Sequence, residues 1–347
     1  MRQPSFTARR VKAFELGRSL TRTGRKLHLE RRLTVGIETR RAGAAGQHLV
    51  PFSCRRGRVT LSCVDAMVVD RQELMHHRLL GLLPLIAGVP HDGFAAIADI
   101  SDGEDSGPGL LSYCSRDPEA ILIPDHEFVE SHGYRDVRQA ARANPIRWSA
   151  RSNVITWRGA ATGVGSITET LGADDPTLRQ RVRLCLVLKG MPGTDVKVTG
   201  AAPSASAARD MARLAEAGIL GAFIDPLRWL AFKFAIDIDG YSNAWSNLFT
   251  RLLIGCCVLK VESPRGFRQW YYDDLEPWVH YVPVKGDLSD LRDKIGWSAA
   301  NSDECEKIAA RGQAFALERD YDFEIAAAVR RLGEAEAAGR LQTSLGT

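Results

Sequence analysis

One continuous stretch, Lys233 to Ser263, constrains the fold of this 347-residue chain more than any other. It begins with the apolar run Phe234 to Ile238, which an Asp-Gly pair ends, and such a run predicts a buried strand. Apolar residues then recur at helical spacing as far as Gly255, and Cys256 to Val261 indicates a second strand. The pattern predicts one strand-helix-strand step of a parallel sheet, whose strand-to-helix turn is where such sheets bind ligands.

The turn after the first strand has the composition of an anion site. Gly240 can adopt the positive φ that a sharp turn often needs. Ser242 or Asn243 is the expected N-cap of the helix, because either side chain can accept a free backbone N–H of the first turn. The remaining free N–H groups predict a place where a diphosphate is bound.

Two further segments share a family resemblance with this stretch. They are NVITWRGAATG, from Asn153 to Gly163, and WYYDDLEPWVHYVPVKGDLSDL, from Trp270 to Leu291. Together the three segments resemble glycosyltransferase family 90, which includes protein O-glucosyltransferases and bacterial lipopolysaccharide-core glycosyltransferases. The resemblance implies an α/β chain of the GT-B fold, with two Rossmann-like domains facing a central cleft. It also implies metal-independent, inverting transfer from a UDP-sugar.

Composition and patterning divide the chain into four parts. Residues 1–45 are rich in arginine and lysine, which predicts a basic arm that is either solvated or in contact with an anionic membrane. Residues 46–150 are expected to form the acceptor-side α/β domain. Residues 151–320 are expected to form the nucleotide-sugar domain, and residues 321–347 a C-terminal helix.

Bulk composition argues against several classes of protein. A net charge of +4, and a basic segment without aromatic residues interleaved as stacking platforms, argue against a nucleic-acid-binding protein. Seven cysteines without a C-x-x-C pair give no zinc site and are typical of a reducing compartment. No apolar stretch approaches the ~20 residues of a membrane helix, and no signal peptide is apparent. We therefore expect a cytoplasmic protein that can contact the inner face of the membrane.

The resemblance places the first part of the donor site after the strand Asn153 to Trp157. Arg158 offers a fork of donors to phosphate oxygens. Gly159, Thr162 and Gly163 follow in a loop that lets the backbone approach a diphosphate closely. This loop is neither a Walker A loop nor a G-x-G-x-x-G motif that opens an apolar helix, so ATP-binding and NAD-binding functions are poorly supported.

The second part of the donor site contains the D-x-D pair Asp237 and Asp239, which alternation places on one side of the strand. Such a pair holds a metal in some glycosyltransferases, but the resembled family is metal-independent. We therefore expect Asp239 to line the donor pocket or hold the turn, with no metal. Together with Gly240, Ser242 and Asn243 it completes this part.

Two further donor positions lie downstream. Eukaryotic relatives carry an arginine where this chain has Asn247, and Arg251, one turn further along the same helix face, is the candidate substitute. Glu262 follows the next strand and can accept hydrogen bonds from sugar or ribose hydroxyls.

Inverting transfer needs a general base for the acceptor hydroxyl. In the segment AAIADISDGED, the resemblance places that aspartate at Asp102, where an Asp-Gly turn follows a strand. Asp99 and Asp105 stay open as alternatives, and Asp125 is the runner-up.

The sequence thus predicts a glycosyltransferase that acts on a glycan or lipid-linked glycan acceptor in lipopolysaccharide or other envelope polysaccharide biosynthesis. The alternative is a non-catalytic lipid- or glycan-binding protein that retains the transferase fold, and Asn247 is the feature that supports it. A nucleotide-dependent oxidoreductase is a weaker hypothesis.

Overall fold

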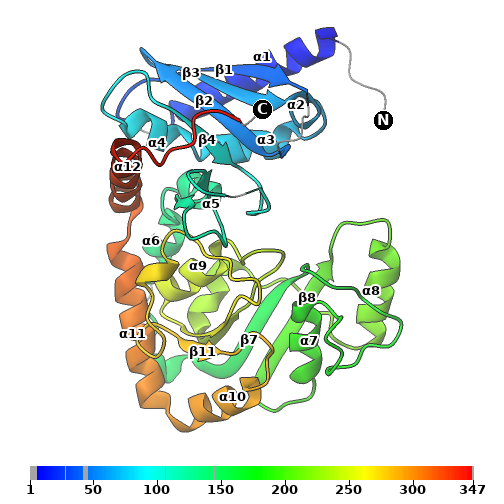
Figure 1. Cartoon of the computed structure of the whole chain (residues 1–347). Coiled ribbons are helices and arrows are strands. Elements are labelled where there is room, and N and C mark those ends of the chain that lie inside the picture. The colour runs from blue at the N-terminus through cyan, green and yellow to red at the C-terminus, as the bar shows by residue number, and fades with distance from the viewer. Residues whose placement is uncertain (1–5, 28, 42–45, 106, 144, 346–347) are drawn as a thin grey trace. The chain divides into compact units, whose positions relative to one another are not determined.

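The computed structural model describes residues 6–27, 29–41, 46–105, 107–143 and 145–345, and the chain divides into two compact units (Figure 1). Unit 1 comprises Met1–Tyr134, Phe267–Trp270 and Arg319–Thr347. Unit 2 comprises Arg135–Gly266 and Tyr271–Glu318. The first boundary therefore follows Tyr134, whereas the sequence patterning suggested residue 150. The C-terminal helix, predicted as a separate part, belongs to unit 1.

Unit 1 is built on a mixed sheet of six strands. Its elements are α1 (Phe6–Gly24), β1 (Thr34–Arg40), β2 (Leu49–Arg55), β3 (Arg58–Val64), α2 (Asp65–Asp70), α3 (Gln72–Leu80), α4 (Leu83–Gly88), β4 (Ala95–Asp99), β5 (Leu111–Ser112), β6 (Ile121–Leu122), α5 (His126–Glu130) and α12 (Tyr321–Ala337). The strand order is β1-β3-β2-β4-β5-β6. All neighbouring pairs are parallel except those of β2, which runs antiparallel to both β3 and β4.

The basic N-terminal segment is part of this unit, and the expectation of a separate arm is corrected here. Helix α1 buries Leu16 and Leu20, and β1 extends the sheet by pairing with β3. The helix lies so close to β1 that a Cβ on Gly17 would be 2.8 Å from the carbonyl oxygen of Val35. The sequence did not indicate that α1 packs on the sheet, because the segment is rich in arginine and few of its apolar residues are buried.

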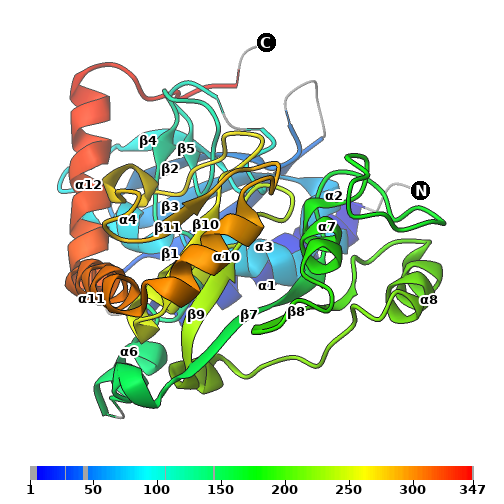
Figure 2. The ribbon, with the colours of Figure 1, turned by 90° about the horizontal axis from the view of Figure 1, so that it is seen from below.

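Unit 2 is built on a parallel sheet of five strands. Its elements are α6 (Arg135–Ala143), β7 (Ser152–Ala161), α7 (Gln180–Val187), β8 (Thr194–Ala201), α8 (Ala207–Glu216), β9 (Phe232–Asp237), α9 (Ser246–Ile254), β10 (Cys257–Val261), β11 (Val282–Val284), α10 (Leu291–Ala300) and α11 (Ser302–Glu318), with 3₁₀ turns at Trp148–Ala150, Pro226–Ala231 and Tyr272–Asp274. The order is β11-β10-β9-β7-β8, and β8, β7 and β9 follow one another across the sheet in Figure 2. Numbered along the chain this is the doubly wound order 2-1-3-4-5, with its switch point between β7 and β9.

The α/β class, with two sheets rich in parallel strands, is confirmed. The predicted strand, helix and strand of the central stretch are β9, α9 and β10, and Gly255 ends α9 in the left-handed conformation at φ 76°. The predicted N-cap is wrong, because Trp245 occupies that position. Asn243 instead accepts a hydrogen bond from the backbone N–H of Trp245 at 2.5 Å and closes a turn ahead of the helix. Within the described ranges, no helix has an apolar stretch long enough to cross a bilayer.

Candidate functional site

Two loops of unit 2 meet at the switch point of its sheet. Thr162 and Gly163 follow β7, whereas Asp239 and Gly240 follow β9. Gly163 has φ 126°, and a Cβ there would lie 3.2 Å from the carbonyl oxygen of Gly240. A Cβ on Gly240 would lie 2.8 Å from the hydroxyl of Thr162. The structure therefore brings together four of the predicted donor residues, in the place where doubly wound sheets bind ligands.

Arg181 of α7 joins these two loops. Its Nε donates to the carbonyl oxygen of Asp239 at 3.0 Å, and its Nη2 donates to that of Ile238 at 3.0 Å. Its Nη1 donates to the hydroxyl of Thr162 at 2.9 Å. Burial lowers the pKa of Arg181, and the carboxylates of Asp237 and Asp239 oppose that shift. The guanidinium thus fixes both loops through backbone and hydroxyl oxygens.

The sequence interpretation missed Arg181. A signal was present in the segment RQRVR, which places charged residues at alternate positions on a helix that is otherwise largely apolar. Arg179 likewise donates to the carbonyl oxygen of Ala161 at 2.7 Å, and Gln180 donates to that of Gly286 at 2.5 Å. The start of α7 therefore contacts loops after β7, β9 and β11.

The carboxylate of Asp239 is held inside this site. Its residue is 5% exposed, and neither carboxylate oxygen has a hydrogen bond of normal geometry within the described part of the chain. Burial raises the pKa of Asp239 to about 6, although Lys260 and the Ser263 hydroxyl act in the opposite direction. A buried carboxylate with unused lone pairs is suited to accept hydroxyl donors from a ligand.

Asp237 lies beside it but has partners of its own. Its Oδ1 accepts a hydrogen bond from the Asn247 amide at 2.7 Å, and its Oδ2 is 3.7 Å from the Lys260 ammonium. Lys260 also lies 4.2 Å from the centre of the Tyr272 ring. Among the residues described here, no three His, Cys, Asp or Glu side chains gather as a metal site. Lys260 was also missed, although a lysine inside the apolar run CVLKV is a recognisable signal.

Three other predicted donor residues lie at this end of the sheet or on the turn. Ser242 and Asn243 are buried, and their side chains are 3.4 Å apart. The carbonyl oxygen of Asn243 accepts the N–H of Gly240 at 3.1 Å, so the segment folds back on itself. Glu262 follows β10 with an exposed side chain.

The two predicted arginines are bonded elsewhere. Arg158 donates to the Asp195 carboxylate at 2.7 Å and to the carbonyl oxygens of Asp195 and Ala222 at 2.8 and 3.0 Å, on the β8 side. Gly159 has a packing role, because a Cβ there would lie 2.6 Å from the Trp157 ring.

The guanidinium of Arg251 lies 3.7 Å from the centre of the Trp229 ring. Burial lowers the pKa of Arg251 to about 10. Neither Arg158 nor Arg251 joins the loop cluster, and their roles at a diphosphate stay predictions.

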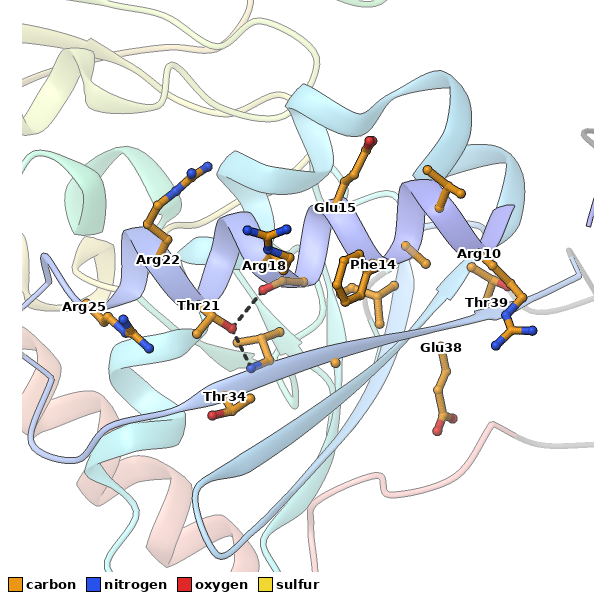
Figure 3. Close-up of a pocket in the computed structure, with 16 residues that line it drawn as sticks. Arg10, Phe14, Glu15, Arg18, Thr21, Arg22, Arg25, Thr34, Glu38 and Thr39 are labelled. Carbon is orange, nitrogen blue, oxygen red and sulfur yellow. Dashed lines mark hydrogen bonds between the residues drawn. The ribbon is translucent and has the colours of Figure 1, made fainter. Parts of the chain in front are cut away.

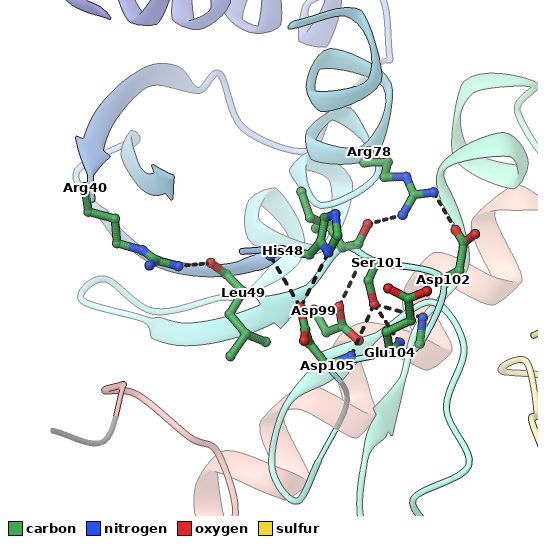
Figure 4. A network of polar contacts seen from close by, with 11 residues as sticks. Arg40, His48, Leu49, Arg78, Asp99, Ser101, Asp102, Glu104 and Asp105 are labelled. Atoms are coloured by element: carbon green, nitrogen blue, oxygen red, sulfur yellow. Dashed lines mark hydrogen bonds and ion pairs between the residues drawn. The ribbon is translucent and has the colours of Figure 1, made fainter. Parts of the chain in front are cut away.

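In unit 1, Asp102 lies in the polar loop that follows β4 (Figure 4). The guanidinium of Arg78 donates to its Oδ1 at 2.5 Å and also to the carbonyl oxygen of Ile100. The Asp102 side chain is 29% exposed, so an acceptor hydroxyl can reach it.

Two of the three alternatives are less accessible than Asp102. Asp99 is buried, which raises its pKa to about 6, and its carboxylate accepts the N–H of Ser101. Asp125 is also fully buried, with a pKa raised to about 8, and it caps α5 by accepting the N–H of Phe128. Asp105 is partly exposed and pairs with His48 at 3.5 Å. Access therefore favours Asp102 or Asp105 as a base.

Comparison with known proteins finds a family match over part of unit 2. Residues 208–323 match the family described as Glycosyl transferase family 90. These residues are similar to a glycosyl transferase family 90 domain. The matched range includes Asp239, Gly240 and Lys260, whereas the loop after β7 precedes it.

Individual relatives cover parts of the chain. It is 38% identical to human Protein O-glucosyltransferase 3 over 104 residues, which are 30% of this chain and 19% of that protein. It is 29% identical to uncharacterized protein 027R of Frog virus 3 over 235 residues, which are 60% of this chain and 23% of that protein. The chain thus spans less than a quarter of either relative. Anabaena Alr3699/HepE, solved with UDP-glucose, is 13% identical with a TM-score of 0.36, over 59% of this chain and 53% of that one.

Proposed function

We propose that this protein is a glycosyltransferase that moves a sugar from a UDP-sugar to a glycan acceptor by inverting displacement without a metal. The observation that carries the proposal is the meeting of the Thr162–Gly163 and Asp239–Gly240 loops at the switch point of a doubly wound sheet. The family 90 domain and the relatives named O-glucosyltransferases support transfer of a sugar as the reaction.

Different residues of the site bind different parts of the donor. The close-packed glycines leave backbone groups open to a diphosphate, and the buried Asp239 carboxylate accepts hydroxyls of the ribose or the sugar. Two cations, Arg181 and Lys260, balance the carboxylates of Asp237 and Asp239, so these carboxylates do not need a metal ion to lie side by side.

The reaction is a single displacement. The acceptor hydroxyl oxygen attacks the anomeric carbon while the base, Asp102 in this proposal, takes its proton. The bond from the anomeric carbon to the diphosphate oxygen breaks, and UDP leaves with the electron pair. The acceptor is a glycan or lipid-linked glycan of the bacterial envelope, such as lipopolysaccharide, and residues 1–45 contact an anionic membrane surface.

One observation favours the alternative of a non-catalytic binding protein. Asn247 replaces the family arginine and is bonded to Asp237, while Arg251 is packed on Trp229. A protein of this kind retains the fold without the cation that assists the departing diphosphate.

The test is calorimetric titration of the purified protein with UDP, with and without EDTA, followed by a transfer assay with UDP-sugars. We expect UDP binding that survives EDTA. Absence of UDP binding overturns the proposal, and binding without any transfer or hydrolysis of a UDP-sugar favours the alternative.

A matched pair of glycine variants tests the site itself. Gly163→Ala adds a Cβ against the Gly240 carbonyl and should weaken UDP binding roughly tenfold, ~1.4 kcal/mol. Gly190→Ala is the control, because Gly190 also has a positive φ of 74° but no atom within 4 Å of the added Cβ. Both variants carry the left-handed backbone penalty, about 1 kcal/mol, so equal UDP affinities in the two would remove the loop contact from the donor site.

A further inference from the structure

A groove with a volume of about 1520 Å³ runs between α1 and β1 in unit 1 (Figure 3). β1 is the end strand of its sheet, so one side of the groove is the backbone edge of a strand. In Figure 3, Phe14 lies between the helix and the strand, with Arg10 and Arg25 toward opposite ends. The groove contains no residue of the proposed donor or base sites.

The lining of the groove is positively charged. It includes four arginines and two glutamates, and these are Arg10, Arg18, Arg22, Arg25, Glu15 and Glu38. Arg18, Arg22 and Arg25 are exposed, and none is ion-paired with a carboxylate among the described residues. Glu15 is itself paired with Lys12 at 3.3 Å. The unneutralised guanidiniums favour an anionic ligand, and their planar forks suit phosphate oxygens.

The same surface has apolar features that an ion alone does not need. Phe14 is 64% exposed and Val11 49% exposed, one helical turn apart on α1. A second cavity of about 340 Å³ adjoins the groove and shares Thr21, Arg25 and Val35 with it. Its other lining residues are mainly leucines with two arginines, and these are Leu20, Gly24, Leu29, Arg31, Arg32, Leu33 and Leu83. A cavity lined by both leucines and arginines fits an amphiphile that has an anionic head.

An extended peptide added to the edge of β1 is the competing occupant of such a groove. The helix opposes that arrangement at one end of the strand. The Thr21 hydroxyl accepts the backbone N–H of Val35 at 2.9 Å, and Gly17 lies against the Val35 carbonyl oxygen. The Val35 N–H that a peptide would use there is therefore already bonded, and the backbone of Gly17 covers the Val35 carbonyl oxygen.

We propose that this groove binds the phosphate headgroup of an anionic lipid in a bilayer. The arginines contact the phosphate, Phe14 and Val11 enter the membrane interface, and the leucine-lined cavity receives part of an acyl chain. The proposal refines the membrane contact included in the proposed function, but it depends on unit 1 residues that take no part in nucleotide binding. Its failure therefore leaves the donor site untouched.

The test is co-sedimentation of the full chain with vesicles of phosphatidylcholine alone or of phosphatidylcholine containing phosphatidylglycerol. We expect binding only to the phosphatidylglycerol vesicles, weakened by added salt. Arg18→Glu combined with Arg22→Glu should weaken it roughly tenfold or more. Phe14→Ser should also weaken it, and this variant keeps the net charge of the groove unchanged. The matched control is Arg209→Glu combined with Arg228→Glu, two exposed arginines of unit 2.

Further measurements keep the result interpretable. Circular dichroism and UDP titration of each variant show whether it is folded, and equal UDP affinity separates this proposal from the proposed function. Inorganic phosphate in place of vesicles distinguishes a lipid headgroup from free phosphate. Undiminished vesicle binding by the Arg18 and Arg22 double variant overturns the proposal. Equal loss of vesicle binding in the Arg209 and Arg228 control, or equal binding to neutral vesicles, also overturns it. Saturable binding of phosphate alone, or displacement of the vesicles by an acidic peptide, overturns it as well.

Discussion

Replacing Asp239 by asparagine should make the free protein more stable and the UDP complex weaker. Burial raises the pKa of Asp239 from 3.8 to about 6. A change of about two pKa units, at ~1.4 kcal/mol each, means that the buried charge costs about 3 kcal/mol of unfolding free energy above pH 6. Asparagine has nearly the same shape without the charge, so Asp239→Asn should recover most of that free energy.

The stability difference between Asp239→Asn and the wild type should depend on pH. Above pH 6 the folded wild type holds an ionised carboxylate, and the variant should be more stable by about 3 kcal/mol. As the pH falls from 6 to 4 the carboxyl becomes protonated in the folded state, so the wild type loses this disadvantage and the two proteins converge. Urea unfolding at pH 7.5, 5.5 and 4.5 measures this, because the midpoint follows stability when the m-value is unchanged.

Asp237→Asn is the matched control on the same strand. Asp237 is paired with Lys260 and bonded to Asn247. Losing that pair leaves a buried ammonium without its partner and should destabilise the protein by roughly 3 kcal/mol, opposite in sign to Asp239→Asn. Asp239→Asn should at the same time weaken UDP binding roughly tenfold, ~1.4 kcal/mol. A destabilised Asp239→Asn variant, or a stability gain that does not change with pH, would refute the reasoning.

Three further predictions concern the loops and the base. Arg181→Met should lower the unfolding free energy by roughly 3 kcal/mol and weaken UDP binding, because buried oxygens of two loops lose their donor. Arg183→Met, on the same helix, is the control and should change UDP affinity little. Urea titration measures the stability of both variants, and calorimetry measures their UDP affinity. Asp102→Asn should lower the transfer rate roughly 100-fold or more while UDP affinity changes less than twofold, and normal turnover excludes it as the base. Arg158→Ala should cost about 1 kcal/mol of stability through loss of the Asp195 pair; a parallel fall in UDP affinity supports its diphosphate role, and unchanged affinity removes it.

Local patterns predicted the central strand-helix-strand step of unit 2. The run FAIDIDG, the helical spacing that follows it and the left-handed Gly255 are each decided within a few residues, so β9, α9 and β10 could be predicted without knowledge of their neighbours. The N-cap was mispredicted because several polar residues precede α9. Which of them caps the helix depends on how Asn243 folds the turn.

The candidate site was only partly accessible to such reasoning. Glycines and aspartates after strands mark loops at one edge of a parallel sheet, so the contribution of Thr162, Gly163, Asp239 and Gly240 could be expected. Arg181 could not be placed, since its contacts join residues from two strands that are far apart in sequence. Arg158 was predicted in the donor site but lies elsewhere, because its side chain is bonded to the Asp195 carboxylate of the neighbouring strand β8.

The sequence by itself determined the class of fold, the strand-helix-strand step and the family to which the central stretch is similar, because these depend on short-range periodicity and motif spacing. Tertiary structure alone decided the strand order, and hence which two loops meet at the switch point. It also decided that the basic N-terminal segment packs as a helix and an end strand, and that the Asp239 carboxylate is buried while Asp237 is bonded to Asn247 and Lys260. Such properties depend on which distant residues exclude water from a charge or supply its partner, and spacing along the chain does not specify that.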